Sequence, residues 1–359
     1  MTDQLPTAHQ PEPVENEPEP IPLARRLRDP RTIISIVLPL LLLLLIALNI
    51  EDFRLDELPG IILRANPLLL LAALAIYYLG FPLRGYRWAL LLRSAGTHVK
   101  VRDSTEIIFI SWLVNCLVPA KLGDVYRAYL LRVNFLVSLS RTFGTVFIER
   151  VFDLFAIAIL GLVAGFWSFR TGMTTEVQIV FGLGIVVVVV LSVGLYTVRN
   201  LGRRTLIRLP LPRKQKLLEF YERFEEGVFA INPRQVPYLA AITALIWATE
   251  ALRLLLVIEA LGFTDVQLGI SGVFFVALAA SLLTAIPFTP AGLGIVEAGV
   301  VGILTIIYGV DPTNAFAITI VDRAISVLSV IMLGSVVYVL SSKTKPGPRE
   351  PQASDTAAA

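Results

Sequence analysis

The sequence predicts an all-α polytopic membrane protein with about 6–8 transmembrane helices, two broken or re-entrant helical hairpins and an inverted repeat. Its composition is 55% hydrophobic and 16% charged, with a mean hydropathy of +0.73, which is too apolar for a soluble domain. Apolar stretches of about 20 residues, enough to cross a hydrocarbon core of about 30 Å, recur along the chain. Two similar helix-breaking motifs begin at Pro119 and Pro290, 171 residues apart, and indicate a repeat.

The two ends of the chain are polar. Residues 1–30 are rich in proline and glutamate, and residues 342–359 are also polar, so we expect two disordered cytoplasmic tails. Between them, residues 31–341 form one predicted transmembrane domain. Arginines precede the first apolar stretch, and no cleavage motif follows it, so we interpret this stretch as an uncleaved signal anchor.

Six uninterrupted apolar stretches are predicted to be membrane helices, with bounds of about 32–49, 66–83, 142–169, 177–198, 236–261 and 313–341. Two further apolar regions, 104–140 and 268–309, are each interrupted by a Pro-Ala-x-Leu-Gly motif. The region from residue 199 to residue 216 contains seven cations and no acid, so it is predicted to be cytoplasmic. By the same rule both termini are cytoplasmic and the protein lies in the cytoplasmic membrane.

This orientation means that each interrupted region begins and ends on one membrane face. The arm 105–118 is too short for an untilted span, so 104–140 is predicted to re-enter from the cytoplasm. Region 268–309 begins outside and is compatible with re-entry or with two full spans. Two opposed re-entrant regions would make 66–198 and 236–341 inverted halves, joined by the polybasic linker 199–235.

Charged residues lie inside these apolar stretches, where they are costly and usually face a cavity or a partner. Each motif is followed, about thirty residues later, by an acid-arginine pair. The predicted helix breaks are Pro119, Gly123, Pro290, Gly292 and Gly294. The predicted substrate-binding residues are Lys121, Asp124, Arg127, Glu149, Arg150, Asp153, Glu297, Asp322 and Arg323.

The chemistry expected of these residues is anion binding. Arginine grips phosphate oxygens bidentately, and Asp124 is placed to cap a half-helix whose free amides would face the same cavity. The acids would balance the arginines or bind a cationic headgroup. The alternative is that these ion pairs only lock helices together. Glu250 and Arg253 are spaced to pair directly, whereas Arg84 and Arg87 are expected to extend from a helix end to lipid headgroups.

Residues 213–231 have an amphipathic pattern, with Leu217, Tyr221, Phe224 and Val228 on one helical face. Together with the preceding cations, this pattern predicts an interfacial helix near anionic lipid. A cytoplasmic linker helix is the alternative.

The segments Pro119–Arg127, Glu149–Asp153 and Pro290–Glu297 resemble the motifs of the lysylphosphatidylglycerol synthase transmembrane-domain family, which is flippase-like. The resemblance covers about residues 30–341. It implies the family's membrane fold and the flipping of aminoacylated phospholipid, as in the bacterial multiple-peptide-resistance factor. Lys121 and Asp124 stand where the family has arginine and glutamate, and Ala291 where it has glycine. The aminoacyl-transfer domain of that factor has no counterpart here.

The leading hypothesis is therefore a lipid translocase for an anionic phospholipid or a lipid-linked sugar, rather than an enzyme, with no catalytic residue. A glycosyltransferase that uses a polyprenyl-phosphate sugar is an alternative, because Glu51, Asp52, Asp56 and Glu57 could bind a divalent metal. A third is a non-transporting partner of a lipid-modifying or cell-envelope enzyme. One cysteine, two histidines and no phosphate-loop motif argue against a zinc site, a nucleotide or another cofactor; no nucleic-acid partner is expected, and the oligomeric state is left open.

Overall fold

The structure is a computed structural model that describes residues 54–344, apart from 171, 209–213, 264, 265 and 267, and also residues 30, 32–34, 37 and 41. The described chain is all-α, without a strand. Most of the predicted helix 32–49 and of the two tails lies outside the described residues. Residues 342–344, predicted to belong to the disordered tail, form a helical turn, because Lys343 is buried and its ammonium lies 2.7 Å from Asp103.

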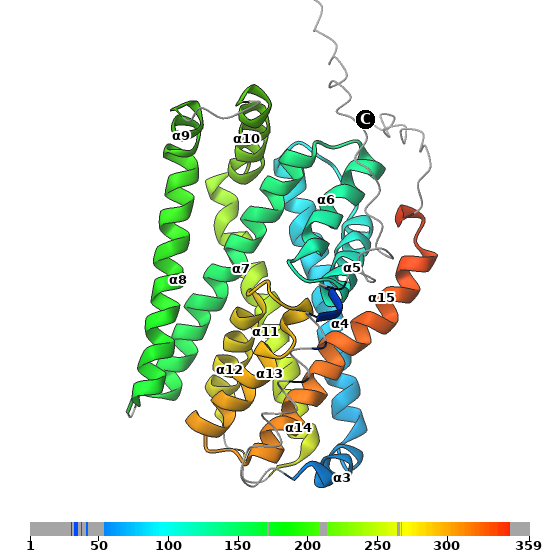
Figure 1. Cartoon of the computed structure of the whole chain (residues 1–359), viewed down its shortest axis with the longest axis vertical. Coiled ribbons are helices and arrows are strands. Elements are labelled where there is room, and N and C mark those ends of the chain that lie inside the picture. Colours follow the sequence, from blue (N-terminus) through cyan, green and yellow to red (C-terminus); the bar gives the residue numbers. More distant parts are fainter. Residues whose placement is uncertain are drawn as a thin grey trace, which may run out of the picture.

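The first part of the bundle begins with two short helices and continues with four long ones (Figure 1). These are η1 (Leu55–Glu57), α3 (Leu58–Leu63), α4 (Pro67–Ser94), α5 (Val101–Leu117), α6 (Leu122–Phe135) and α7 (Leu139–Ser168). Three helices then connect the two parts: α8 (Thr175–Asn200), α9 (Gly202–Arg208) and α10 (Lys214–Phe229). In Figure 1, α9 and α10 lie at the upper end of the bundle and α3 lies at the lower end.

The second part repeats the order of the first. It consists of η2 (Pro233–Gln235), α11 (Val236–Leu261), α12 (Gly269–Thr284), η3 (Pro290–Gly292), α13 (Ile295–Gly302), η4 (Ile303–Ile307), α14 (Pro312–Arg323), η5 (Ala324–Leu328), α15 (Ser329–Leu340) and η6 (Ser342–Thr344). The segments η4 and η5 are π-helical, and they make α13–η4 and α14–η5–α15 continuous rods. Thus α4, α5, α6 and α7 correspond, in this order, to α11, α12, α13–η4 and α14–η5–α15.

Five helical segments of the described chain are long and apolar enough to cross a membrane. They are Pro67–Ser94, Val177–Asn200, Pro233–Leu261, Pro290–Ile307 and Pro312–Leu340. Helix α7 also has the length of a span, at 30 residues, but carries charged residues in its middle. The prediction of an all-α integral membrane protein is confirmed, and the predicted bounds of α11 agree with the structure to the residue.

Both interrupted regions fold as hairpins whose arms are short. The arms have 17 and 14 residues in α5 and α6, 16 in α12, and 8 and 5 in the two segments of α13–η4. All are shorter than the roughly 20 residues of an untilted span. In Figure 1 the α5–α6 hairpin extends from the upper end to the middle of the bundle, and the α12–α13 hairpin extends there from the lower end. Region 268–309 thus turns back at the middle of the bundle, which is the arrangement expected of a re-entrant hairpin.

The pairing of α4 with α11 holds the two parts together. At their crossing, a Cβ on Gly80 would lie 3.3 Å from Thr249 Oγ1, so the small glycine favours this close approach. Farther along, the Tyr86 and Tyr238 hydroxyls form a hydrogen bond of 2.9 Å. This close contact brings charged residues of α4 beside those of α11.

Helix α10 does not present its whole apolar face to lipid. Gly227 faces Gly144 of α7 so closely that a Cβ on Gly144 would lie 2.8 Å from Gly227 Cα, and Phe224 packs edge-on against Phe147 at 5.4 Å. Val228, on the same face, is buried. The C-terminal part of this apolar face therefore packs on α7, because two glycines let the helices approach each other, whereas Leu217 is exposed.

Candidate functional site

Two networks of buried ion pairs occupy the middle of the bundle. In the first, Arg87 of α4 donates to Asp153 Oδ1 at 2.6 Å and to Glu149 Oε1 at 3.1 Å, both on α7. Arg127 of α6 binds the other oxygen of Glu149 and lies over the Trp88 ring at 4.0 Å. As predicted, Glu149 and Asp153 share one face of α7, because they are four residues apart. Their pairing joins α4, α6 and α7.

Arg150 extends this network to the first break. Its guanidinium binds Asp124 bidentately, with Nη2–Oδ1 at 2.8 Å and Nε–Oδ2 at 3.1 Å. It also lies 3.5 Å from Asp153. The side chain of Arg150 is 32% exposed, whereas that of Arg127 is fully buried. Arg150 is therefore the accessible arginine of this network.

The second network is built from α4, α11, α13 and α14. Arg84 and Arg253 hold the two oxygens of Glu250 at 2.6 and 2.5 Å, and Arg253 binds Asp322 bidentately at 2.8 and 3.0 Å. The predicted direct pairing of Glu250 with Arg253 is confirmed. Removing one partner from such a buried pair leaves an uncompensated charge, which typically costs about 3–5 kcal/mol.

Arg323 closes the second network onto the second break. Its Nε donates to Glu297 Oε1 at 2.6 Å, and its Nη2 donates to the carbonyl oxygen of Ala291 at 2.7 Å. Glu297 also accepts the Gly294 amide at 2.6 Å, which caps α13. The side chain of Arg323 is 13% exposed. Two of its donor atoms, Nε and Nη2, thus bind groups of the protein itself.

Corresponding residues of the two networks are separated by a constant number of residues in the sequence. In each of the pairs Asp124–Arg150 and Glu297–Arg323 the partners are 26 residues apart. The acids, and likewise the arginines, are 173 residues apart in the sequence. The same ion pair therefore anchors α6 to α7 in one half and α13 to α14 in the other.

The two breaks also have the same backbone conformation. Ala120 and Lys121 have φ values of 63° and 54°, and their counterparts Ala291 and Gly292 have φ values of 51° and 73°. Two successive residues in the left-handed region are unusual, and each residue other than glycine is strained there. This conformation allows the chain to turn back at the middle of the bundle without continuing the helix.

The two breaks contact each other. The Ala120 amide donates a hydrogen bond of 2.9 Å to the carbonyl oxygen of Pro287, across the two hairpins. Ala120, Pro287 and Phe288 are exposed at this junction. The predicted substrate-binding residues Asp124 and Arg150 lie on one side of the junction, and Glu297 and Arg323 lie on the other.

Asp124 does not cap α6, contrary to the sequence-based expectation. The Asn115 side chain of α5 accepts the Gly123 amide at 2.8 Å, and Asp124 instead uses both carboxylate oxygens for Arg150. The reason is the close packing of the hairpin, because a Cβ on Gly123 would lie 2.0 Å from the Ser111 carbonyl oxygen. The cap that was predicted at Asp124 is found at Glu297 in the other half.

The expectation for Arg84 and Arg87 is also wrong. Both are buried near the centre of α4, because this helix continues to Ser94 through Pro82, where the sequence suggested that the span ends. Proline is tolerated inside membrane helices because neighbouring groups satisfy the freed carbonyl. Their spacing of three residues, which places both on one helix face, was the signal that could have identified them as network members.

Lys121 differs from the other cations of the site. The six acids of the two networks each have an arginine partner. Among the described residues, no carboxylate lies within 4.0 Å of the Lys121 ammonium. Six arginines balance six acids, so Lys121 gives the junction one positive charge in excess.

The acidic segment near residue 51 is only partly described. Glu51 and Asp52 lie outside the described residues, and Glu57 pairs with Arg54 at 3.1 Å. In the described part of the chain, no group of three or more His, Cys, Asp or Glu residues is placed to hold a metal ion.

These features define a helical integral membrane protein with two opposed broken hairpins and a polar centre. The chain belongs to the lysylphosphatidylglycerol synthase TM region family, whose profile matches residues 32–334. It is 34% identical to a UPF0104 membrane protein of Methanocaldococcus jannaschii over 63% of this chain and 93% of that protein. It is 28% identical to a UPF0104 membrane protein of Methanothermobacter thermautotrophicus over 77% of this chain and 87% of that protein. It is also 28% identical to the glycosyltransferase AglD of Haloferax volcanii, over 84% of this chain and 53% of that protein. The resemblance found in the motifs is thus confirmed, and these three relatives come from archaea.

Proposed function

We propose that this protein moves an anionic lipid headgroup across the membrane, and that the phosphate binds at the junction of the two breaks. The observation that carries the proposal is the excess positive charge of Lys121, beside the accessible guanidinium of Arg150. A phosphate brings the negative charge that this junction lacks. The lipid would be an anionic phospholipid or a lipid-linked sugar.

Arg150 suits the role of phosphate ligand because its fork already binds a carboxylate bidentately. A bound phosphate would take over part of this fork from Asp124, while Lys121 would supply a second, unpaired donor. Arg127 and Glu149 are buried and bind each other. We therefore assign them the role of holding α6 on α7 beneath the binding residues.

The opposed hairpins supply a route for movement. Broken helices that enter from the two membrane faces and meet near the midplane are common in transporters, where one half moves against the other. Here the contact between the breaks is the hydrogen bond from Ala120 to Pro287. Opening of this contact would alternately expose the junction to either leaflet, and the polybasic α9–α10 end would be the cytoplasmic one.

A flip assay tests this function. The purified protein is reconstituted in liposomes that contain a fluorescent phosphatidylglycerol, and the fraction of probe accessible to an external quencher is followed in time. We expect Lys121→Gln and Arg150→Gln to slow exchange by about ten- to a hundredfold, the cost of one charge-assisted hydrogen bond. Arg170→Gln is the matched control, because Arg170 stacks on Trp167 away from the networks. Exchange no faster than in empty liposomes, or unchanged in both variants, would refute the proposal.

A second candidate function is glycosyl transfer, which is favoured by the name of the Haloferax volcanii relative. The aligned region spans about half of that relative. We would test for metal-dependent transfer of sugar from a polyprenyl phosphate by the purified protein, and for its loss in Asp52→Asn. Transfer that persists in Asp52→Asn would remove the proposed metal site, and the absence of any transfer would remove the candidate.

A further inference from the structure

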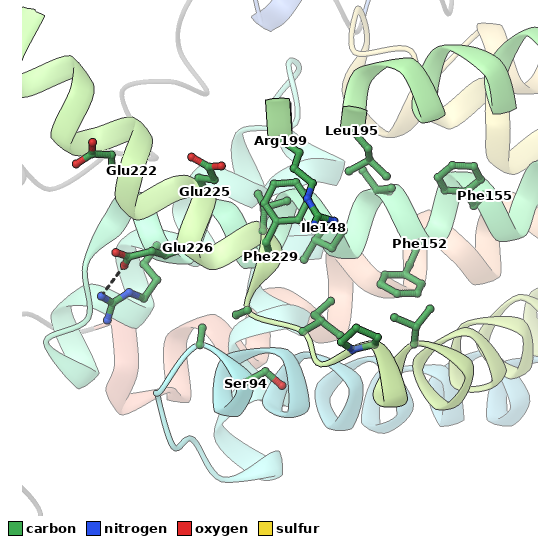
Figure 2. Close-up of a pocket in the computed structure, with 18 of the residues that line it drawn as sticks. Ser94, Ile148, Phe152, Phe155, Leu195, Arg199, Glu222, Glu225, Glu226 and Phe229 are labelled. Atoms are coloured by element: carbon green, nitrogen blue, oxygen red, sulfur yellow. Dashed lines mark hydrogen bonds and ion pairs between the residues drawn. The ribbon is translucent and has the colours of Figure 1, made fainter. Parts of the chain in front are cut away.

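A second binding region lies on the other face of α7. A cleft of about 1180 Å³ opens between α7, α8 and α10 (Figure 2). Its floor includes Ile148, Phe152 and Phe155 of α7 and Leu195 of α8. The three α7 residues are spaced four and three apart and therefore share a face, whereas Glu149 faces the central network. The cleft is thus separated from the junction by α7 itself.

The rim of the cleft is charged. Arg141 pairs with Glu226 at 3.0 Å, and Arg203 pairs with Glu222 at 3.1 Å. These four side chains are satisfied by one another across the helices. They frame a polar rim above an apolar floor, an arrangement that matches an amphiphile.

Two further charged residues that line the cleft have no such partner. Neither Arg199 nor Glu225 has an ion pair with any described residue. The Arg199 guanidinium lies over the Phe229 ring at 5.7 Å, and Figure 2 shows Arg199 and Glu225 on the two helices that border the cleft. A face-on contact with a ring leaves the N–H groups at the edge of a guanidinium able to donate. Among the described residues, the rim therefore offers one cation and one anion that have no ion-pair partner.

The floor continues to the surface of α8 that faces the bilayer. Only 6% of the most apolar 18-residue stretch of α8 is buried within the described structure. Val189, Val193 and Tyr196 of this helix are exposed. Leu195 of the floor is next to Tyr196 in the sequence, so the floor adjoins this exposed apolar surface of α8. This continuity favours a lipid over a water-soluble ligand.

We propose that this cleft binds one membrane phospholipid with an amine-bearing headgroup. Its phosphate binds Arg199, its ammonium binds Glu225, and its acyl chains lie on the floor formed by Ile148, Phe152 and Leu195. The site goes beyond the proposed translocation, because Lys121 and Arg150 do not line it. Binding to it is measurable whether or not the protein moves lipid.

The test is native mass spectrometry of the full-length protein in detergent, titrated with phosphatidylethanolamine and, separately, with phosphatidylglycerol. We expect one tightly bound phosphatidylethanolamine, and binding weakened about tenfold or more in Arg199→Gln and in Glu225→Gln. Glu225→Gln should leave phosphatidylglycerol binding unchanged, since that lipid has no amine. Arg170→Gln and Glu219→Gln are the matched controls, because Glu219 lies exposed on α10 and does not line the cleft.

The location of the bound lipid is tested with a photoactivatable phosphatidylethanolamine that carries its reactive group on an acyl chain. We expect labelled peptides from residues 148–155 or 195–199, and loss of that label in Leu195→Trp, which fills the floor. Equal binding of both lipids in all variants, or labelling spread evenly along α8, would overturn the proposal. A cleft cross-linked to another segment of this chain or to a second copy, without lipid, would also overturn it. Lys121→Gln should retain the labelling, which separates this site from the translocation site.

Discussion

The first break, at residues 118–121, and the second, at residues 290–293, share a backbone conformation but differ in what they expose. The first carries Lys121, without a carboxylate partner among the described residues, and lies beside an arginine that is 32% exposed. The second carries Gly292 at the matching position, and its arginine, 13% exposed, binds the carbonyl oxygen of its own break.

This difference indicates that the two equivalent breaks have different roles. In the second half, Arg323 and Glu297 satisfy the break and cap α13, so the hairpin is closed on itself. In the first half, Asn115 takes over the capping, and the Asp124–Arg150 pair is left at the accessible side of the junction. Under the proposed function, the second break would be a structural support and the first would remain available to bind lipid.

The largest effect is expected from the buried arginines. Arg253→Met leaves Asp322 without a cation and should lower the free energy of unfolding by about 3–5 kcal/mol. Arg127→Met should cost less, because Arg87 still pairs with Glu149. Unfolding in mixed micelles, followed by circular dichroism, measures both. If both variants lost the same free energy of unfolding, the remaining Arg87–Glu149 pair would not compensate for the loss of Arg127.

A steric change at the first break comes next. Gly123→Ala places a Cβ 2.0 Å from the Ser111 carbonyl oxygen and should destabilise the hairpin by about 1–3 kcal/mol. Gly302→Ala on α13 is the control, because a Cβ there meets no atom within 4 Å. Thermal unfolding of the two variants side by side measures the difference, and an undiminished melting temperature in Gly123→Ala would contradict the tight packing described here.

The two matched arginines should separate stability from transport. Arg323→Ala removes the bonds to Glu297 and Ala291 and should cost about 1–2 kcal/mol more stability than Arg150→Ala, whose side chain is more exposed. Arg150→Ala should in turn slow the flip rate more, measured on variants at temperatures where both stay folded. The opposite order in either measurement would remove the distinction between a supporting and a binding break.

The smallest effect concerns backbone strain. Lys121→Gly and Ala291→Gly each place glycine at a positive φ and should stabilise the protein by up to about 1 kcal/mol. Ala291→Gly should leave the flip rate unchanged, whereas Lys121→Gly should reduce it, because only Lys121 carries the excess charge. Melting temperatures and flip rates of the two variants check this pair of outcomes.

The helices and breaks were accessible from the sequence because they depend on local properties. Apolar length located α11 and α8, and the repeated Pro-Ala-x-Leu-Gly motif located both breaks. The predicted end of the second membrane helix near residue 83 was wrong. Pro82 lies inside α4, and this helix continues for about three more turns to Ser94. Local signals for a helix end do not reveal whether neighbouring helices satisfy the freed backbone groups.

By itself, the sequence determined the membrane class, the positions of the two interruptions and the set of charged residues available at the centre. Apart from the Glu250–Arg253 pair, which the sequence predicted, only the tertiary structure decided which of these residues pair. The crossing of α4 with α11 at Gly80 places Arg84 and Arg87 in separate networks, and the Asp124–Arg150 pair holds Arg150 near Lys121 at the first break. Pairing depends on how helices approach one another, and this geometry is set by packing between segments that are as much as 166 residues apart, as in the Arg84–Glu250 pair.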